Sequence, residues 1–368
     1  MGLLGCRMLD KNKVNHLIDT GYISKRKHPT ENLYILNYTP KCQIEWHWTP
    51  ETIACRGLIV DDNWNIIERP FLKFFTQDQW ETLRNDVAHL YGVQYKYMME
   101  GPFSVYDKLD GSFSVLFFTD GKPQMATRGS FESEQAIRAN QMIQGSLAKQ
   151  FKFPFDRSAT YLFEIIYPEN RVVVNYGAEE KMPLLAVIDK QTGKDRWDLF
   201  ERYKLAGFPA ASLYNFQDYV PLGWHNKDYG FNNKEGFVIY FHNSGMRVKV
   251  KFKEYMRLHK IMTGSWTDRK IWWMLREGYD LKSYMEEHNI PDEFYHDIVE
   301  RSVDMKIKYD EIYKHVQSII QKEIIRRNPP LTRKQLAIKY KDYQYKAVMF
   351  AILDNKEYKQ TIWRLIRP

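Results

Sequence analysis

The stretch that decides the fold is Lys108-Leu109-Asp110-Gly111-Ser112, which lies where one strand-like run ends and the next begins. Asp-Gly is a turn-forming pair, so it would hold Lys108 at the lip of a sheet. From there the amine could attack the α-phosphate of a nucleoside triphosphate and keep the nucleotide. Since Lys-x-Asp-Gly arises by accident in about one chain in ten of this length, its meaning depends on its companions. The structural alternative is a plain hairpin turn.

Two carboxylates follow along the chain. Glu164 lies inside the apolar run at residues 161–167, where an unpaired charge is costly to bury. A sugar hydroxyl is a fitting partner for it, and a structural pairing with Arg171 is the alternative. Glu235-Gly236 comes directly before the strand-like run at residues 237–241, so a second carboxylate is predicted at a strand end.

A pair of lysines completes the pattern. Asn243-Ser244-Gly245 predicts a turn into a strand at residues 246–252, whose alternation places Lys249 and Lys251 on one face. Two like charges on one face repel each other, so we expect an anion such as a triphosphate between them. A solvated sheet face is the alternative.

In this order, the motifs resemble those of the covalent nucleotidyltransferases, which include ATP-dependent ligases and mRNA capping enzymes. Within that group the chain most resembles the phage RNA ligase 1 family. The finer match is carried by Arg56-Gly57, Arg69-Pro70-Phe71-Leu72-Lys73-Phe74-Phe75, Leu162-Phe163-Glu164-Ile165 with Asn170-Arg171, and Lys249-x-Lys251-x-x-x-Tyr255. The resemblance runs from Arg56 to the C-terminus and is strong up to Tyr255. One motif departs: the family commonly has Lys-Gly-Ser where this chain has Arg128-Gly129-Ser130, and arginine presents a planar fork instead of a point donor.

The resemblance implies an ATP-dependent RNA ligase that works in three steps. A lysine takes AMP from ATP, passes it to an RNA 5′-phosphate, and a 3′-hydroxyl then displaces AMP to seal the strand. It therefore implies ATP and Mg²⁺ as cofactors. It also implies RNA with 5′-phosphate and 3′-hydroxyl ends as the partner, with nicked tRNA in a repair role.

The resemblance also implies roles for individual residues. Lys108 would be the nucleophile, Glu235 would act near the metal or the reacting phosphate, and Glu164 would bind the ribose. Arg56 and Lys73 would contact the triphosphate, and Phe75 or Tyr255 would flank the adenine. The full catalytic set is Lys108, Glu235, Lys249 and Lys251, with Glu235 also the metal ligand. The full nucleotide-binding set is Arg56, Lys73, Phe75, Asp110, Gly111, Arg128, Glu164, Gly236 and Tyr255.

The periodicity of the chain changes once. Residues 33–252 show short strand-like runs, with helix-like stretches at residues 132–151 and 197–205, which predicts an α+β arrangement. After Glu254 the apolar spacing becomes helical, most clearly at Ile298, Met305, Tyr309, Ile312, Val316 and Ile319. We therefore expect a nucleotidyltransferase domain at residues 1–254, with ATP-grasp-like antiparallel sheets and flanking helices as the resemblance implies. An all-helical C-terminal domain would follow at residues 255–368.

Charge is unevenly distributed along the chain. The whole chain has 54 Lys and Arg against 46 Asp and Glu, and residues 301–368 alone have 16 against 7. A basic terminal region beside a nucleotide-transfer site favours RNA or tRNA binding, because each neutralised phosphate releases counterions. Tyr340, Tyr343, Tyr345 and Trp363 could stack on bases, although at helical spacing such residues more often form core.

Composition limits the remaining classes. A chain of 368 residues with 44% hydrophobic residues can supply two cores. Cys6, Cys42 and Cys55 form no Cys-x-x-Cys pair, which argues against a disulfide framework or a zinc knuckle. No apolar run reaches the length of a membrane span, and no signal peptide is evident. We expect a cytoplasmic protein, encoded by a phage if the resemblance extends to its source.

Two other functions compete with the ligase. A capping guanylyltransferase would carry GMP on Lys108 and would normally continue into an oligonucleotide-binding β-barrel after Lys251. A non-enzymatic RNA-binding protein would have an inactive site, yet Lys108, Glu235, Lys249 and Lys251 are all present.

Overall fold

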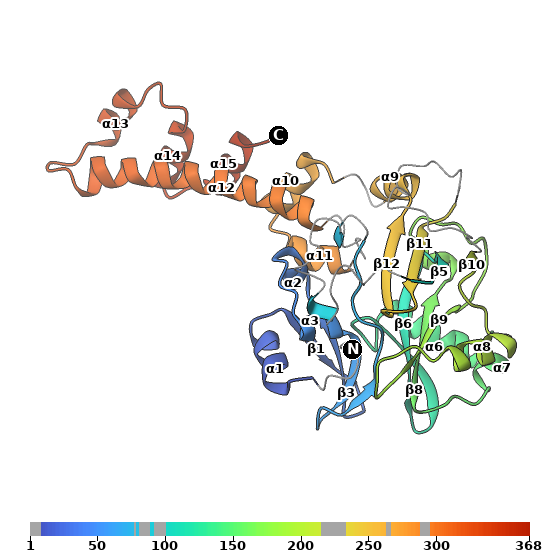
Figure 1. The fold of residues 1–368 in the computed structure, drawn as a ribbon. Helices are drawn as coiled ribbons and strands as arrows, with labels where there is room; N and C mark the ends of the chain where they lie inside the picture. The colour runs from blue at the N-terminus through green and yellow to red at the C-terminus, as the bar shows by residue number, and fades with distance from the viewer. Residues whose placement is uncertain are drawn as a thin grey trace. The chain divides into compact units, whose positions relative to one another are not determined.

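The computed structural model of the protein describes residues 9–76, 79–80, 89–91, 101–214, 233–262, 266–287 and 295–368. The fold divides into two compact units, Met1–Thr263 and Gly264–Pro368 (Figure 1). The division falls just after helix α9 (Lys253–Met262). Each unit has its own buried core.

Three four-stranded antiparallel sheets make up the framework of the first unit. Sheet A has the order β1 (Ile23–Lys27), β2 (Leu33–Tyr38), β3 (Arg56–Asp61), β4 (Ile66–Glu68). Sheet B has the order β10 (Leu213–Tyr214), β5 (Phe103–Lys108), β11 (Gly236–Phe241), β12 (Met246–Lys251). Sheet C has the order β7 (Lys122–Thr127), β6 (Ser112–Thr119), β8 (Ala159–Ile165), β9 (Leu184–Asp189). The antiparallel sheets confirm the predicted α+β fold class.

Helices flank these sheets and begin where the sequence supplies caps. They are α1 (Lys11–Asp19), α2 (Pro40–Ile44), α3 (Pro50–Ala54), α6 (Glu134–Gln144), α7 (Ala148–Phe151) and α8 (Trp197–Leu205), with short 3₁₀ turns η2 (His89–Tyr91) and η3 (Pro168–Asn170). Thr39 and Thr49 cap α2 and α3 through their hydroxyls, and each helix then starts on a proline. The predicted helix at residues 132–151 is two helices, α6 and α7, because the chain turns at Gly145.

Two tight turns set the register of the hairpins. Asp120 and Gly121 join β6 to β7 with φ of 48° and 75°, the left-handed geometry of a tight hairpin. The turn at residues 243–245 joins β11 to β12, where Gly245 donates to the carbonyl of Phe241. Along β12 buried and half-buried residues alternate, which confirms that Lys249 and Lys251 share one face.

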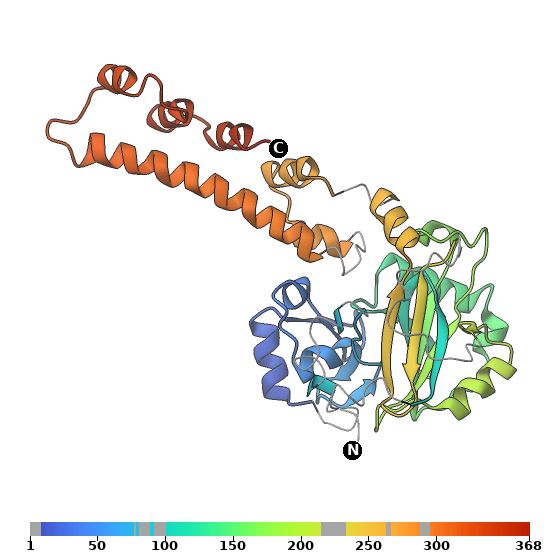
Figure 2. The same ribbon diagram turned by 45° about the horizontal axis from the view of Figure 1, so that its top comes forward.

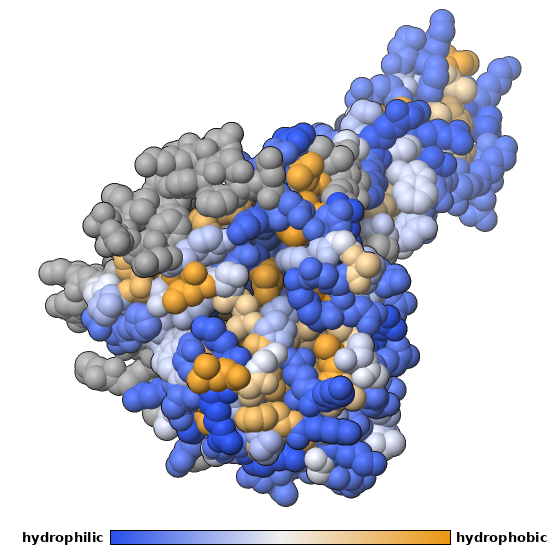
Figure 3. Space-filling view, turned by 90° about the vertical axis from the view of Figure 1, so that its right-hand side faces the viewer, coloured by the Kyte–Doolittle hydropathy of each residue, from blue (hydrophilic) through white to orange (hydrophobic). Residues whose placement is uncertain are grey.

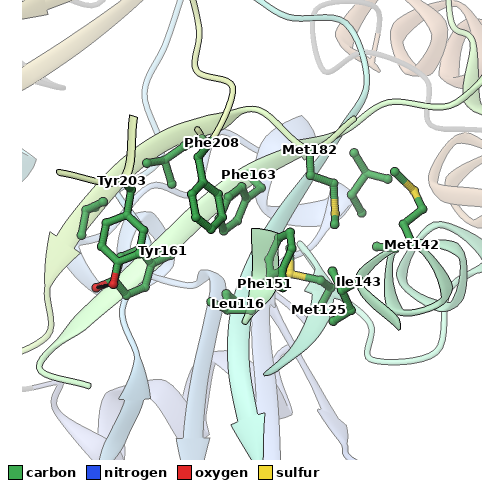
Figure 4. Packing of buried hydrophobic residues seen from close by; sticks show 14 of the residues in the cluster. Leu116, Met125, Met142, Ile143, Phe151, Tyr161, Phe163, Met182, Tyr203 and Phe208 are labelled. Carbon is green, nitrogen blue, oxygen red and sulfur yellow. Dashed lines mark hydrogen bonds between the residues drawn. The ribbon is translucent and has the colours of Figure 1, made fainter. Parts of the chain in front are cut away.

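The largest cluster of buried apolar residues lies between sheet C and helices α6 to α8 (Figure 4). Phe151, Tyr161, Tyr203 and Phe208 make edge-to-face ring contacts there, and Phe163 packs tilted against Phe151. A second cluster holds Trp48, Phe75 and Trp80 together with residues of β12. Since these clusters fix strands of sheets B and C, they also fix the strand ends where the polar motifs lie.

The second unit consists of helices throughout its described part (Figure 2). They are α10 (Asp268–Arg276), α11 (Leu281–Glu287), α12 (Tyr295–Ile320) with a π-helical end (Gln321–Ile325), α13 (Arg333–Lys339), α14 (Lys346–Leu353) and α15 (Lys359–Leu365). Ile312, Val316, Val348, Met349 and Ile362 form its buried core. Every described element after β12 is a helix, which confirms the helical C-terminal prediction and argues against a terminal β-barrel. Tyr340, Tyr343 and Tyr345 pack against this core, as the structural alternative anticipated.

On the face shown in Figure 3, hydrophilic residues predominate and hydrophobic residues form small separate patches. No helix in the described part of the chain has the length and apolar character to cross a membrane. Cys42 and Cys55 are buried free thiols, and Cys6 lies outside the described residues.

Candidate active site

One end of sheet B brings three of the predicted motifs together. Gly236 at the start of β11 pairs with Lys108 at the end of β5 and with Lys251 at the end of β12. The register therefore places Glu235, the residue before Gly236, between two lysines that are distant in sequence. A Cβ on Gly236, whose φ is 154°, would lie 2.0 Å from the carbonyl oxygen of Val250, so only glycine fits there.

The Glu235 carboxylate bridges the two lysines. Its Oε2 lies 2.7 Å from Lys108 Nζ, and its Oε1 lies 3.0 Å from Lys251 Nζ. Burial alone would raise the pKa of Glu235, but the charges of Lys108 and Lys251 hold this pKa below its ordinary value. Glu235 is thus a buried carboxylate kept ionised by two cations.

Lys249 lies on the same face of β12 as Lys251. Its backbone N–H donates to the carbonyl of Phe75 at 3.1 Å, which ties β12 to the segment after sheet A. The sequence predicted an anion beside the two strand lysines. For Lys251 this anion is the carboxylate of Glu235 in the structure.

The Lys108-to-Ser112 stretch is a crossing between two sheets and not a hairpin. β5 belongs to sheet B and β6 to sheet C, so the chain changes sheets at Asp110 and Gly111. A hairpin would have paired the two strands with each other. The crossing places Lys108 at the end of one sheet and facing the neighbouring end of the other.

Asp110 holds this crossing in place. Its Oδ2 accepts hydrogen bonds from the backbone N–H groups of Val173 and Val174 at 2.9 and 2.8 Å, and its Oδ1 accepts the hydroxyl of Tyr255 at 2.8 Å. Its own N–H donates to the hydroxyl oxygen of Tyr176 at 2.9 Å. Burial and the neighbouring Glu235 raise the pKa of Asp110, while these donors oppose the shift. Asp110 therefore holds the crossing at residues 108–112 against residues 173–176 and helix α9.

Glu164 reaches the same place from sheet C. Gly111 donates its N–H to Glu164 Oε1 at 3.1 Å, and a Cβ on Gly111 would lie 2.5 Å from the carbonyl oxygen of Ile165. Burial raises the pKa of Glu164 to about 8, and the charges of Lys108 and Arg56 work against this rise. Arg171 donates to the carbonyl of Val173. The structural partner of Glu164 is therefore the backbone N–H of Gly111 and not the side chain of Arg171.

Arg56, the first residue of β3 in sheet A, has its guanidinium group against sheet C. Its guanidinium carbon is 4.3 Å from the centre of the Phe113 ring, and Phe113 is the cross-strand partner of Glu164. Gly57, with φ of 85°, follows it and lies beside the backbone of Arg128. Arg56 is therefore close enough to act electrostatically on Glu164.

Lys73 and Arg128 form a second group around Tyr38. Arg128 Nη1 donates to the Tyr38 hydroxyl at 3.1 Å, and Lys73 Nζ lies 5.2 Å from the centre of the Tyr38 ring. Lys73 is only 2% exposed, and its Nζ also lies 5.4 Å from the Trp48 ring. These contacts place two of the predicted triphosphate-binding cations on one tyrosine.

The two aromatic residues predicted to flank adenine are both buried. Phe75 packs among Trp46, Trp48 and Trp80. Tyr255 packs with Val173 and Val174 while it donates to Asp110. A base could stack on either ring only after the surrounding side chains moved.

Several supporting residues were not predicted from the sequence. Tyr176 accepts the Asp110 N–H, and Asn170 bonds both the Ser112 hydroxyl and the Ile165 carbonyl. Asn233 receives a bond from the N–H of Asn175 and donates to its carbonyl. Polar residues in a loop give no period from which such pairings could be found. The sequence indicated Asn170 only as part of the motif that it shares with residues 162–165.

The carboxylates do not form a dedicated metal cage. Within the described ranges, no three His, Cys, Asp or Glu side chains come together as a metal cluster. Magnesium needs few protein ligands, because it keeps several waters and commonly binds through one or two carboxylates and substrate phosphates. A single buried carboxylate such as Glu235 fits that mode.

The chain is similar in sequence to known RNA ligases. A sequence model of the family described as RNA ligase matches residues 54–256. This range includes every predicted site residue, from Arg56 to Tyr255. An RNA ligase of Rhodothermus phage RM378 is 26% identical over 401 aligned positions, which cover 89% of this chain and 86% of that protein. A protein of Autographa californica nuclear polyhedrosis virus, described as a bifunctional polynucleotide kinase/RNA ligase, is 25% identical over 69% of this chain and 37% of its own length. Among solved structures, an archaeal ATP-dependent RNA ligase matches with a TM-score of 0.42 and 12% identity, over 83% of this chain and 79% of that one.

Proposed function

Because the chain belongs to the RNA ligase family, we propose that it joins RNA ends through a nucleotide carried on Lys108, with ATP as the source of that nucleotide. The RNA ends would be a 5′-phosphate and a 3′-hydroxyl. The observation that supports this most directly is the arrangement at the end of sheet B, where Lys108 and Lys251 share the Glu235 carboxylate at 2.7 and 3.0 Å. Glu164 lies next to them through its bond to Gly111.

In the first step, Lys108 Nζ would attack the α-phosphorus of ATP. A nitrogen–phosphorus bond forms, the bond between the α-phosphorus and the bridging oxygen breaks, and pyrophosphate leaves with that electron pair. The attacking amine must be neutral, so the ammonium proton has to leave first. The positive charges of Lys249 and Lys251 would favour the loss of this proton to solvent.

The other cations would stabilise charge on the phosphates. When a triphosphate enters, Lys251 can exchange part of its contact with Glu235 for a phosphate oxygen, and Lys249 lies on the same face of β12. Arg56, Lys73 and Arg128 would contact the β- and γ-phosphates. Glu164 would accept the ribose hydroxyls. A bound divalent cation such as Mg²⁺ would be held at Glu235 and would neutralise charge on the phosphates.

The helical unit would hold the RNA. The surplus of basic residues at 301–368 suits a polyanion, and the transfer chemistry needs none of them. In this division of labour, residues 1–254 carry the nucleotide and residues 255–368 grip the substrate, which we propose to be a nicked tRNA. Given its phage relative, the protein would act in the cytoplasm of an infected cell.

A labelling experiment tests the proposal. The protein is incubated with magnesium and α-labelled ATP or GTP, denatured, and examined for label that stays on the chain. We expect label from ATP on the wild type and none on Lys108→Ala, whereas Lys204→Ala, an exposed lysine on α8, should label normally. Label from GTP alone would point to a capping enzyme, and no label from either nucleotide would point to a binding protein.

A sealing assay tests the second half. A labelled RNA with a 5′-phosphate and a 3′-hydroxyl should be joined by the wild type and not by Lys108→Ala. Label transfer without any joining of RNA would contradict the ligase assignment.

A further inference from the structure

One short segment connects all three sheets of the first unit. We name residues 68–76 the strap. It leaves sheet A at Glu68, the last residue of β4, and forms an isolated parallel bridge with β12 of sheet B at Thr76. It contains Lys73, and its neighbours belong to elements that carry the other site residues. No role in the proposed chemistry explains the polar residues at its start.

The start of the strap is bonded to sheet C by four hydrogen bonds. Glu68 Oε2 accepts the Thr160 hydroxyl at 2.8 Å, and Glu68 Oε1 accepts from Lys190 Nζ at 2.9 Å. The Arg69 N–H donates to Thr160 Oγ1 at 2.8 Å, and Arg69 Nε donates to the Lys190 carbonyl at 2.7 Å. Glu68 and Thr160 are 1% and 0% exposed, so the bond between them is shielded from water.

The rest of the strap contacts helix α3 and sheets A and B. The Lys73 N–H donates to the carbonyl of Ile53 in α3 at 2.9 Å, and the Phe75 carbonyl accepts the Lys249 N–H at 3.1 Å. Between them, the Phe71 ring lies 5.1 Å from the guanidinium carbon of Arg56 and 5.0 Å from that of Arg247 in β12. The strap is therefore anchored at both ends and in the middle.

The anchors bear on two groups of site residues. Thr160 lies on β8, the strand that carries Glu164, and Lys249 lies on β12, the strand that carries Lys251. The length of the strap thus limits the spacing between the sheet with Glu164 and the sheet with the lysines. Lys108, Glu235 and Lys251 are placed by strand pairing within sheet B and by the Asp110 crossing, whereas the sheet C anchor of the strap bonds to other residues.

We propose that Glu68 is a positioning residue, which, through Thr160, Lys190 and Arg69, holds the nucleotide-binding groups Glu164 and Lys73 at the spacing that ATP requires. The inference rests on the proposed function. Breaking the sheet C anchor should weaken nucleotide binding, because Glu164 and Lys73 bind the nucleotide. It should leave the transfer step itself nearly unchanged, because the reacting groups lie on sheet B.

The ionisation of Glu68 gives the anchor a pH response. Burial raises the pKa of Glu68 to about 7, while Lys190, Thr160 and the nearby Arg157 oppose the rise. The charged and polar groups that face it are thus Lys190, Arg157, Arg69 and Thr160. As the pH falls below about 7, Glu68 gains a proton. The ammonium group of Lys190 then no longer faces a charged carboxylate.

The test is the ATP dependence of Lys108 labelling at 25 °C, measured as KM and maximal rate for Glu68→Gln and Thr160→Val. Each variant breaks the anchor by a different bond, and the second introduces no change of charge. We expect KM for ATP to rise about tenfold in both variants, with the maximal rate within about twofold of the wild type. In the wild type, KM should rise as the pH falls from 8 to 6, because Glu68 gains a proton. In Glu68→Gln, KM should rise less over the same pH range. Glu201→Gln, which removes a carboxylate from an exposed ion pair with Lys204, is the matched control and should leave KM unchanged.

The outcomes separate the two proposals. Unaltered KM values in folded Glu68→Gln and Thr160→Val would overturn the positioning role, and so would a loss of rate that tracks loss of folded protein in thermal unfolding. Failure of the wild type to label with ATP would instead overturn the proposed function.

Discussion

The carboxylates of the candidate site and the basic surplus of the helical unit are held in opposite ways. In the first unit Asp110, Glu164 and Glu235 are buried, and each has identified donors within hydrogen-bond distance. In the helical unit the basic surplus lies largely on the surface, as at Lys306, Lys308, Lys322, Lys334 and Lys341. A buried charge cannot turn to water when a partner is lost, whereas an exposed charge can. Single substitutions of these buried carboxylates should therefore have large effects, and substitutions of the exposed helical lysines should have small, additive, salt-dependent effects.

The largest effect is expected from Asp110→Ala, which tests the buried side of this comparison. The change leaves two backbone N–H groups and the Tyr255 hydroxyl without their acceptor. We expect a loss of about 3 kcal/mol in unfolding free energy, measured by urea denaturation. We also expect a roughly 100-fold slower labelling of Lys108, because the crossing at residues 108–112 loses its position.

Asp110→Asn is the matched control for that prediction. Its amide oxygen can accept from Val173 and Val174, and its amide nitrogen can donate to the Tyr255 oxygen. Most of the stability should therefore return. An Asp110→Ala protein as stable and as active as the wild type would show that burial of this carboxylate does not matter.

An intermediate effect is expected from the pH dependence of Glu164. Its folded-state pKa of about 8 lies above the ordinary value of 4.5. Its stabilising contribution is therefore complete below about pH 4.5 and is lost as pH rises through about 8. Urea unfolding of the wild type and of Glu164→Gln at pH 5, 7 and 9 should show the wild type losing stability relative to the variant as pH rises.

Nucleotide binding should respond in the opposite direction. If the Glu164 carboxylate accepts the ribose hydroxyls, ATP affinity should rise by up to about tenfold between pH 7 and pH 9 in the wild type. In Glu164→Gln this dependence should be absent. Equal pH profiles for the two proteins would remove Glu164 from the ribose role.

The smallest effect is expected on the helical surface. Lys334→Ala and Lys341→Ala should each weaken RNA binding by about two- to threefold and reduce the salt slope by about 0.7, without changing labelling by ATP alone. Fluorescence anisotropy of a labelled RNA at several salt concentrations measures both quantities. Gln344→Ala, an exposed neutral residue nearby, is the control. A loss of tenfold or more from one lysine would mean that the two units bind charge in the same way.

Local patterns were enough to predict much of the fold. The strand ends at Lys108 and Gly236, the turn at residues 243–245 and helix α8 follow from turn residues and periodicity that act over a few positions. The long helix α12 also follows, since its buried positions repeat at the helical period. The change of sheets at Asp110 and Gly111 does not follow, because a turn signal does not say which strand the next one will pair with.

The site was predicted in part for the same reason. Ordered motifs indicated Lys108, Glu164, Glu235 and Lys251, and pairing of distant strands brings these side chains together. The bridge of Glu235 between two lysines and the bonds of Asp110 to a loop depend on tertiary geometry that no period encodes. The same holds for Glu68, which looks like an ordinary charged residue at the end of a short strand.

The register of sheet B has a practical consequence for studies of folding. Lys108 and Gly236 meet only when β5 and β11, which are distant in the chain, have paired, and contacts of that kind form late and slowly. A chain trapped before that closure has a lysine but no bridging carboxylate beside it. Under the proposed function, the time at which covalent label appears during refolding would therefore report when β5 and β11 have paired.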